Sequence, residues 1–519
     1  MTKTIGIVDL FSGPGGLAEG FASYKDNEGN APFQINISIE KEPSAHSTLL
    51  LRTFIRKFNG LFPDEYYRFL NGELAAEPDW KKLYPEQWAE AVDEARCMEL
   101  GNPETTQFLD RRLEEIRSTY GRNTMVIGGP PCQAYSLVGR ARNAGILDYA
   151  ADQDHRHFLY KEYVAVLQKL EPAVFVMENV KGMLSSAVKG DRLFLQVMED
   201  LKAAAGENSY ALYALSPRSS GFAKSKVLKP SDFIVYSENH GIPQTRHRVI
   251  IVGLRKDIAD KFISEIPFAM KALEKKTTVH EVIGGVPKLR SGLSKKEDND
   301  SAWLLAVKDA VSKVKSVISL YPAEGYEKIY SLLNSCEKTL TPENIFPRKG
   351  KKSAGYMLNS CPKSLADWLA DEKVAVLPNH ETRSHMESDL ARYMFVSLFG
   401  KAFGRSPKAS EFPEELAPNH KNWSTGKFAD RFRVQIEDQP STTITSHISK
   451  DGHYFIHYDP VQCRSLTVRE AARLQTFPDN YYFKGNRTQQ YVQVGNAVPP
   501  YLAKQIAEVL WPVLKKYAD

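Results

Sequence analysis

Near the N-terminus the chain reads Ile5-Gly6-Ile7-Val8-Asp9-Leu10-Phe11-Ser12-Gly13-Pro14-Gly15-Gly16-Leu17-Ala18. A short apolar run gives way to a glycine-rich turn, which from Gly13 fits the pattern G-x-G-x-x-A between a strand and a helix. Glycines let the backbone approach a ligand, and the free N–H groups of a helix N-terminus favour anionic groups. A tight strand-to-helix turn without any ligand explains the same pattern. Glu40, at the end of the next predicted strand, favours a nucleoside-containing cofactor, because a carboxylate there can accept both ribose hydroxyls.

Short apolar runs rich in branched residues recur through the first half of the chain, at residues 5–10, 35–39, 125–127, 174–177, 233–236 and 249–252. They read as buried strands, and helix-like segments alternate with them. This alternation predicts an α/β fold with a mostly parallel, doubly wound, Rossmann-like sheet. A long polar, helix-forming insertion spans residues 52–122, and the sequence assigns it no function.

The chain has 519 residues, which exceeds the ceiling of about 250 to 300 residues for one hydrophobic core and predicts two domains. The strand–helix alternation stops after residue 254, where Lys-rich, loop-like segments begin. The helix-like stretch 501–515 has the apolar spacing to pack back onto the first domain. We therefore expect a first domain at 1–254, completed by 491–519, and a second at 255–490.

Composition bounds the class of protein without deciding the function. No apolar run approaches the ~20 residues of a bilayer span, and no leader precedes the first strand, so we expect a cytoplasmic protein. A net charge of +5 permits a polyanionic partner but does not require one. The five cysteines include no C-x-x-C pair, which argues against a disulfide framework or a structural metal site.

The predicted strand at 125–127 runs into Gly128-Gly129-Pro130-Pro131-Cys132-Gln133. The glycines allow close backbone approach and the prolines stiffen the loop, so a thiol is held where ligands bind in such sheets. A free cysteine is more often a small buried hydrophobe, but its place at a strand end favours a nucleophile. The next strand delivers Glu178 to the same edge; the alternative is a surface carboxylate that caps the following turn.

The stretch Gln244-Thr245-Arg246-His247-Arg248 leads into the strand at 249–252. In an extended segment, residues 244, 246 and 248 share one face, which predicts two guanidiniums side by side there. Such a pair suits a carbonyl oxygen, a phosphate or a structural carboxylate. A solvated basic turn is the alternative.

Six segments, at residues 9–16, 129–136, 178–180, 244–248, 464–479 and 493–500, resemble in order, spacing and identity the motifs of the bacterial cytosine-C5 DNA methyltransferase family. The resemblance implies S-adenosylmethionine as cofactor and double-stranded DNA as partner. It is weak from residue 255 to about 428, within the variable part that in the family is the target-recognition domain. It also implies the modification enzyme of a restriction–modification system, leaves a cognate endonuclease open, and is consistent with a monomer.

The resemblance carries roles onto matching positions. Cys132 matches the nucleophile, Glu178 the acid on the cytosine ring, Arg248 the arginine on its carbonyl oxygen and Arg246 a supporting residue. The matching cofactor residues, with Phe11 against the adenine and Glu40 on the ribose, are Phe11, Ser12, Gly13, Gly15, Gly16, Leu17, Glu40, Asn496 and Val498.

The target base must leave the DNA stack before carbon 5 can react. The segment 136–145 has glycines and arginines that suit a loop closing on DNA, although an ordinary flexible loop would look the same. The expected DNA contacts are Gln133, Ser136, Arg140 and Arg142.

Two local structures are predicted closer to the C-terminus. Residues 441–448 and 453–458 alternate in polarity around Asp451-Gly452, which predicts a hairpin. Thr467, with Glu470 three residues later, predicts the capped start of a helix.

Three rival functions stay open at this stage. A transfer-RNA cytosine-C5 methyltransferase would share Cys132 and Glu178, but the long 255–463 segment favours a DNA-reading enzyme. A catalytically dead DNA-binding protein should lack the nucleophile or the acid, and both are present. A nicotinamide or flavin enzyme would account for the glycine turn only.

Overall fold

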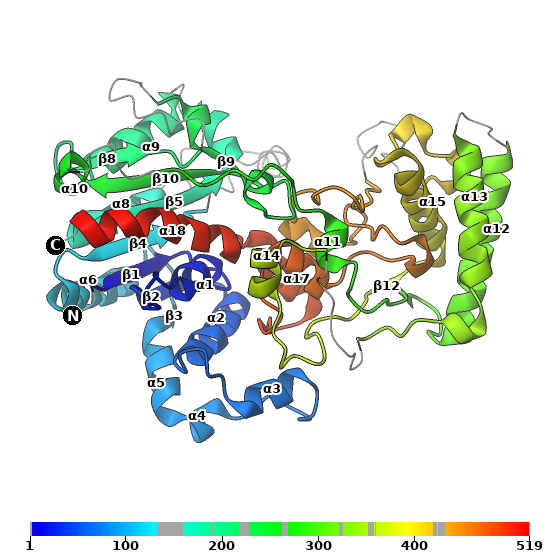
Figure 1. The fold of residues 1–519 in the computed structure, drawn as a ribbon, viewed down its shortest axis with the longest axis horizontal. Helices are drawn as coiled ribbons and strands as arrows, with labels where there is room; N and C mark the ends of the chain where they lie inside the picture. The colour runs from blue at the N-terminus through cyan, green and yellow to red at the C-terminus, as the bar shows by residue number, and fades with distance from the viewer. Residues whose placement is uncertain are drawn as a thin grey trace.

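The computed structural model describes residues 3–131, 159–185, 187–188, 191–216, 228–261, 268–320, 325–350, 358, 360–418, 423 and 431–517. Figure 1 shows a body built around a central sheet and, apart from it, a helical lobe of α12, α13 and α15, with α11, α14 and α17 between them. No helix in these described ranges is both long and apolar enough to cross a bilayer.

The central sheet has the order β3-β2-β1-β4-β5-β10-β8, with β9 paired to β10. Its strands are β1 (Ile5–Leu10), β2 (Phe33–Glu40), β3 (Ala95–Cys97), β4 (Thr124–Gly128), β5 (Val174–Val180), β8 (Tyr210–Tyr213), β9 (Ile234–Tyr236) and β10 (His247–Arg255). The pairs among β3, β2, β1, β4 and β5 are parallel, whereas β10 is antiparallel to β5, β8 and β9. The predicted α/β fold with a mostly parallel sheet is confirmed.

The chain leaves β1 toward β2 on one side, and β4 and β5 lie on the other side. The point where strand order reverses therefore falls between β1 and β4, and ligands of doubly wound sheets bind beyond the carboxyl ends of the strands at such a point. The turns that follow β1 and β4 are the glycine-rich turn and the Pro130-Pro131 loop. Topology thus brings the two most distinctive sequence motifs to one edge.

Helices cover both faces of the sheet. They are α1 (Gly16–Ser23), α2 (Pro43–Arg56), α3 (Asp64–Leu70), α4 (Trp80–Leu83), α5 (Pro85–Glu94), α6 (Pro103–Tyr120), α8 (Leu159–Leu170), α9 (Leu193–Lys202), α10 (Lys256–Lys261) and α18 (Pro500–Tyr517). Val8 of β1 faces a core shared with α6, α8 and α9, whereas Ile7 faces one shared with α1, α2 and α18. The expected return of the C-terminal helix to the sheet body is confirmed, and α18 lies along α1 (Figure 1).

The rest of the chain builds the lobe and its connections. It contains α11 (Val279–Ile283), α12 (Asp300–Leu320), α13 (Tyr326–Thr339), α14 (Lys363–Leu369), α15 (Glu387–Phe403), α16 (Val468–Leu474), α17 (Arg487–Asn496) and the short pairs β6–β7 (Ala187–Val188, Asp191–Arg192) and β11–β12 (Gly292–Leu293, Ser384–His385). One apolar core runs from Phe21 of α1 through Phe477 to Trp303 of α12. The lobe is therefore continuous with the sheet body.

The hairpin predicted around Asp451-Gly452 is wrong. Ser441 instead pairs with Gln244 of the sheet body, and residues Ser446–Ser449 form a short 3-10 helix, η9. The alternation of apolar side chains in this segment comes from burial against the body, where the N–H and the hydroxyl of Thr245 both donate to the Ser441 carbonyl in place of a second strand.

Candidate active site

The glycine-rich turn after β1 has a backbone that side chains rarely permit. Phe11, Gly13 and Gly15 have φ of 56°, 57° and 102°, all in the left-handed region. A Cβ on Gly13 would meet no other atom within 4 Å, so one flank of the turn is open at this residue. Ser12 fixes the turn from within, because its Oγ donates to the Asp9 carbonyl at 3.0 Å.

Glu40, at the end of β2, is joined directly to this turn. Its Oε2 accepts the Gly13 N–H at 2.8 Å and its Oε1 accepts the Glu42 N–H at 2.7 Å. Each carboxylate oxygen keeps acceptor capacity beyond these bonds. The turn and the acid at the end of the second strand are therefore joined by a hydrogen bond between Gly13 and Glu40.

The start of α1 packs against the segment that follows α17. A Cβ on Gly16 would lie 2.2 Å from the Val498 carbonyl oxygen, so only glycine fits there. Leu17 and Val498 are buried, whereas Asn496, the last residue of α17, is exposed. The sequence places these residues almost 500 positions apart, and the structure brings them together at the glycine turn.

The loop after β4 is held by the neighbouring strand. A Cβ on Gly129 would lie 2.9 Å from Glu178 Oε2, and Asn179 Nδ2 donates to the Pro130 carbonyl at 3.1 Å. The expected nucleophile Cys132 and the expected DNA contacts Gln133, Ser136, Arg140 and Arg142 lie outside the described residues. What the structure describes is the stem of this loop, with the Glu178 carboxylate against it.

Glu178 is paired with Arg248 across two antiparallel strands. Arg248 Nε lies 2.8 Å from Glu178 Oε1, and each side chain is 13% exposed. Because β10 runs opposite to β5, its first residues lie beside the end of β5, and Arg248 faces Val180 in the register. Burial lowers the pKa of Arg248, and the adjacent Glu178 opposes that shift.

Arg246 has different hydrogen-bond partners from Arg248, but its guanidinium interacts electrostatically with both Arg248 and Glu178, and a shared face for residues 244, 246 and 248 stays a prediction. The backbone at this point is turned, since the Gln244 N–H bonds to Ile242 O and the Arg246 N–H to Gln244 O. The buried Arg246 guanidinium donates to Ile444 O at 2.8 Å and to Gly495 O at 3.3 Å. Arg246 thus connects β10 to the backbone beside Asn496.

Gln244 belongs to a second buried link that sequence reasoning missed. Its Nε2 donates to Gln475 Oε1 at 2.6 Å, and Gln475 in turn donates to the Ala497 carbonyl. These amides join the segment before Arg248 to α16 and to the segment that carries Val498. Gln244 and Gln475 both lie inside segments that match the family motifs, which was the available sequence signal for them, but only the fold shows that the two side chains meet.

The segment just after β3 supplies a further acid, which the sequence analysis did not identify. The Met98 N–H donates to the Glu40 carbonyl at 3.0 Å, and the next residue, Glu99, pairs with Lys41 at 3.1 Å. Glu99 therefore lies beside the end of β2. The strand is only three residues long, which is why its apolar pattern was too short to recognise.

Asp9 is a buried carboxyl under the glycine turn. It is fully buried, and among the described residues its Oδ1 has no hydrogen-bond partner. Burial raises the pKa of Asp9 to about 7, and Ser12 and Ser38 reduce that effect. The carboxyl thus titrates near neutral pH.

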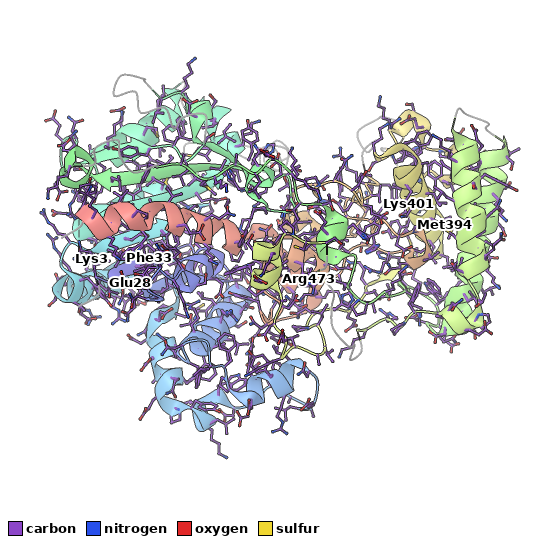
Figure 2. All side chains as sticks on the ribbon, in the orientation of Figure 1. Lys3, Glu28, Phe33, Met394, Lys401 and Arg473 are labelled. Carbon is purple, nitrogen blue, oxygen red and sulfur yellow. The ribbon has the colours of Figure 1, made fainter. Side chains whose placement is uncertain are left out.

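Three buried arginines around α16 fasten the connections between the sheet body and the lobe. Arg464 donates to Leu289 O at 3.1 Å, Arg469 to Pro378 O at 2.9 Å and Arg473 to Val282 O at 3.0 Å. Figure 2 shows Arg473 between the two parts of the molecule. Thr467 caps α16 in a capping box with Glu470, as predicted.

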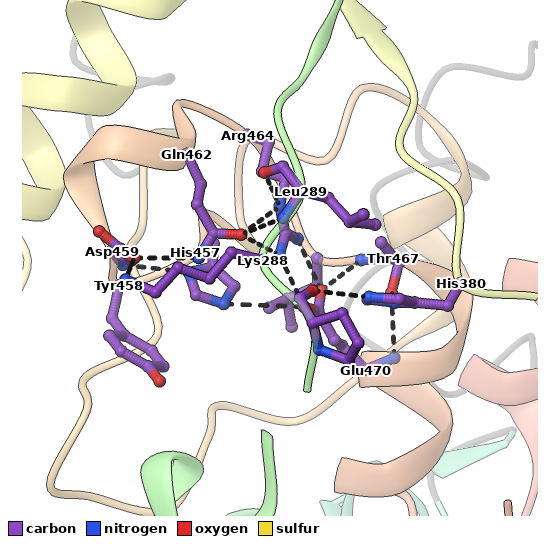
Figure 3. A network of polar contacts seen from close by, with 12 residues as sticks. Lys288, Leu289, His380, His457, Tyr458, Asp459, Gln462, Arg464, Thr467 and Glu470 are labelled. Atoms are coloured by element: carbon purple, nitrogen blue, oxygen red, sulfur yellow. Dashed lines mark hydrogen bonds and ion pairs between the residues drawn. The ribbon is translucent and has the colours of Figure 1, made fainter. Parts of the chain in front are cut away.

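Glu470 lies at the centre of this polar network (Figure 3). Arg464 pairs with both its oxygens at 2.7 Å, and His457 lies 3.7 Å away. Burial alone would raise the pKa of Glu470, but Arg464 holds that pKa well below its usual range. Loss of either Arg464 or Glu470 would leave the other charge buried without its partner, which is strongly destabilising.

Comparisons with known proteins agree on one family. The C-5 cytosine-specific DNA methylase family matches residues 96–511. Type II methyltransferase M.Bpa9945I of Bacillus paralicheniformis is 32% identical over 98% of this chain and 99% of its own length. Type II methyltransferase M1.HphI of Haemophilus parahaemolyticus is 27% identical over 97% of this chain and 86% of its own. Among solved structures, a prophage-encoded E. coli protein assigned as a DNA modification methyltransferase has a TM-score of 0.52 at 19% identity, over 98% of this chain and 99% of its own.

Proposed function

The chain belongs to the C-5 cytosine-specific DNA methylase family and is a DNA (cytosine-5-)-methyltransferase, and on that premise we propose that it methylates a flipped cytosine through a covalent adduct on Cys132. The observation that carries the proposal is the Glu178–Arg248 pair against Gly129, at the stem of the loop that leads to Cys132. An acid and a guanidinium at this edge match the groups that a cytosine ring needs for activation.

Carbon 5 of cytosine is a weak nucleophile, so the ring must first be activated. The Cys132 thiolate adds to carbon 6, and a proton reaches the ring nitrogen with the help of Glu178, which leaves carbon 5 as an enamine carbon. Arg248 holds the ring carbonyl oxygen. After carbon 5 has gained the methyl group, a base removes the carbon-5 proton, the Cys132 thiolate leaves carbon 6, and the ring nitrogen gives up the proton it had gained, which restores the aromatic ring. Arg246 positions this edge through its contacts with Ile444 and Gly495.

The residues around the glycine turn fit S-adenosylmethionine. The open flank at Gly13 and the Glu40 carboxylate beside it form the cradle, with the backbone of Ser12, Gly15, Gly16 and Leu17 continuing it. Phe11 would pack on the adenine, Glu40 would hold the ribose hydroxyls, and Asn496 and Val498 would close the opposite side of the site. Glu99 would contact the adenine amino group, because it precedes the catalytic strand and lies beside the end of β2. Bound there, the cofactor supplies an electrophilic methyl group.

The segment from 255 to 490 is the target-recognition domain of the proposed enzyme, and Gln133, Ser136, Arg140 and Arg142 contact the DNA. Neutralising Arg140 and Arg142 together is expected to reduce the salt dependence of binding. The relatives named as Type II methyltransferases support a role as the modification enzyme of a restriction–modification system. We further propose that the enzyme is a cytoplasmic monomer, with or without a cognate endonuclease. They also favour DNA over transfer RNA as the substrate.

Two experiments test the proposal. After expression in a host that lacks cytosine methylation, mapping 5-methylcytosine at single-base resolution should show one recurring target sequence. DNA with 5-fluorocytosine at that target should form a covalent complex, because fluorine cannot leave as a proton does. Absence of 5-methylcytosine above background contradicts the activity, and trapping that persists in Cys132→Ser contradicts the nucleophile.

A further inference from the structure

The insertion 52–122 makes a specific set of contacts with one connection to the lobe, here called the α14–β12 linker (residues 370–383). Asn71, just after α3, accepts the N–H groups of Ala375 and Val376 at 2.7 and 3.1 Å through its Oδ1. Its Nδ2 donates to the Lys373 carbonyl at 3.0 Å. The Asn71 side chain thus makes three hydrogen bonds to the backbone of this linker, at residues 373, 375 and 376.

Tyr67 adds a second attachment from the same helix. Its hydroxyl donates to Asp371 Oδ2 at 3.0 Å, and the Lys373 ammonium lies 5.0 Å over its ring. Burial, together with the Asp371 carboxylate, raises the pKa of Tyr67, so the hydroxyl keeps its proton and remains a donor. Tyr67 and Asn71 therefore approach the linker from one short helix.

The same carboxylate is tied to the cofactor turn. Asn480 Nδ2 donates to Asp371 Oδ2 at 2.7 Å, and Arg52 donates to Asn480 Oδ1 at 3.0 Å. Arg52 is also paired with Glu19 of α1 at 2.5 Å. Its guanidinium lies 4.8 Å over the ring of Tyr481, whose hydroxyl donates to the Pro14 carbonyl of the turn.

The linker leads directly into the lobe. Arg469 holds it at Pro378, and β12 follows at Ser384–His385, paired with β11 on the other connection to the lobe. A displacement at residues 371–376 would therefore be passed to both connections. The lobe also packs on the body through a continuous apolar core, so loss of the Tyr67 and Asn71 contacts should shift the lobe rather than unfold it.

We propose that the insertion is a brace, in which Tyr67 and Asn71 are positioning residues that set the lobe against the cofactor turn and so determine discrimination between target and near-target DNA. The inference rests on the proposed function, because it assumes that the lobe reads the target. It assigns a role to α3 and the Asn71 that follows it, which the proposed methyl-transfer chemistry does not use.

The test compares kcat/KM on a duplex containing the mapped target with kcat/KM on duplexes carrying one substituted base pair. Asn71→Ala removes three hydrogen bonds and should reduce this discrimination ratio about tenfold. Tyr67→Phe removes one hydrogen bond and should reduce the ratio severalfold. Asn71→Asp keeps the acceptor for Ala375 and Val376 but sets a carboxylate oxygen against the Lys373 carbonyl, so its ratio should lie between those of the wild type and Asn71→Ala. The affinity for S-adenosylmethionine should stay within about twofold in all three variants.

Tyr84→Phe is the matched control, because the Tyr84 hydroxyl donates to Glu65 at 2.8 Å within the insertion and away from the linker. Its ratio should equal that of the wild type. The discrimination ratio does not depend on the concentration of active enzyme. If Tyr67 and Asn71 had only a structural role, their variants would therefore lose thermal stability while the ratio stayed unchanged. If Asn71→Ala has the same discrimination ratio as the wild type, or if the ratio of Tyr84→Phe falls as much as that of Asn71→Ala, the brace is overturned while the proposed function stands. A wild-type protein that methylates no cytosine overturns the proposed function and the brace with it.

Discussion

Glu178 and Arg248 meet across the only antiparallel junction beside β5 that the described residues contain, with 2.8 Å between Arg248 Nε and Glu178 Oε1. The reversal of β10 is what makes this contact possible. In a wholly parallel sheet the first residue of β10 would stand at the opposite edge from the last residue of β5. The pair holds two charged side chains, each 13% exposed, at the edge where the β4 loop emerges.

We expect Glu178→Gln to lower the single-turnover rate of methyl transfer by about 10² to 10⁴, the range for loss of a positioned acid. The affinity for S-adenosylmethionine should stay near that of the wild type, because Glu178 makes no contact with the glycine turn in the structure described. Glu171→Gln, which alters a carboxylate paired with surface arginines, is the control. A Glu178→Gln rate within about threefold of the wild type would contradict the assignment.

Asn179 is expected to position the loop that carries Cys132. Asn179→Ala removes the donor to the Pro130 carbonyl and leaves a buried acceptor unpaired. The rate of covalent trapping on 5-fluorocytosine DNA should fall about tenfold, a change of about 1.4 kcal/mol, with cofactor affinity preserved. Unchanged trapping kinetics would show that the loop is held by other contacts.

Gly16→Ala should weaken cofactor binding, because its Cβ would lie 2.2 Å from the Val498 carbonyl oxygen and force α1 away from that segment. Overpacking of this kind costs about 1 to 3 kcal/mol of stability. Calorimetric titration with S-adenosylmethionine and urea unfolding measure the two effects. Ser23→Ala, near the other end of the same helix, should change neither.

Asp9 predicts an unusual pH dependence of stability. Its pKa is raised from 3.8 unfolded to about 7 folded, so between these values the folded state binds more protons than the unfolded state. This contribution to the free energy of unfolding is complete below about pH 4 and is lost as the pH rises toward 7. Asp9→Asn should therefore be more stable than the wild type at pH 8, and the gain should shrink at pH 5.

Urea unfolding of the wild type and Asp9→Asn at the two pH values measures this difference. The exposed Asp309→Asn on α12 serves as the control and should show no such pH-dependent gain. A gain for Asp9→Asn that is the same at pH 5 and pH 8 would mean that Asp9 does not titrate in this window.

The sequence by itself determined the local elements of this protein and the residue types at its active edge. Branched apolar runs set β1, β4 and β5, because burial on both faces of a parallel sheet imposes a continuous apolar pattern. Thr467 and Glu470 set the start of α16 through local hydrogen bonds. The glycine turn and the Pro130-Pro131 loop were recognisable for the same reason, because glycine and proline are selected by the local backbone conformation.

Only the tertiary structure decided which of these residues meet. The turn before β10 gives Arg246 and Arg248 different partners, and no periodicity in five residues records that turn. The pairing of Ser441 with Gln244 replaced a plausible hairpin, because a hydrogen bond to a distant backbone competes equally with one to a neighbouring strand. The contacts of Asn71 with residues 373–376 join positions about 300 residues apart. Contacts over such separations depend on the packing of the whole core, whereas sequence patterns report only each residue's local surroundings.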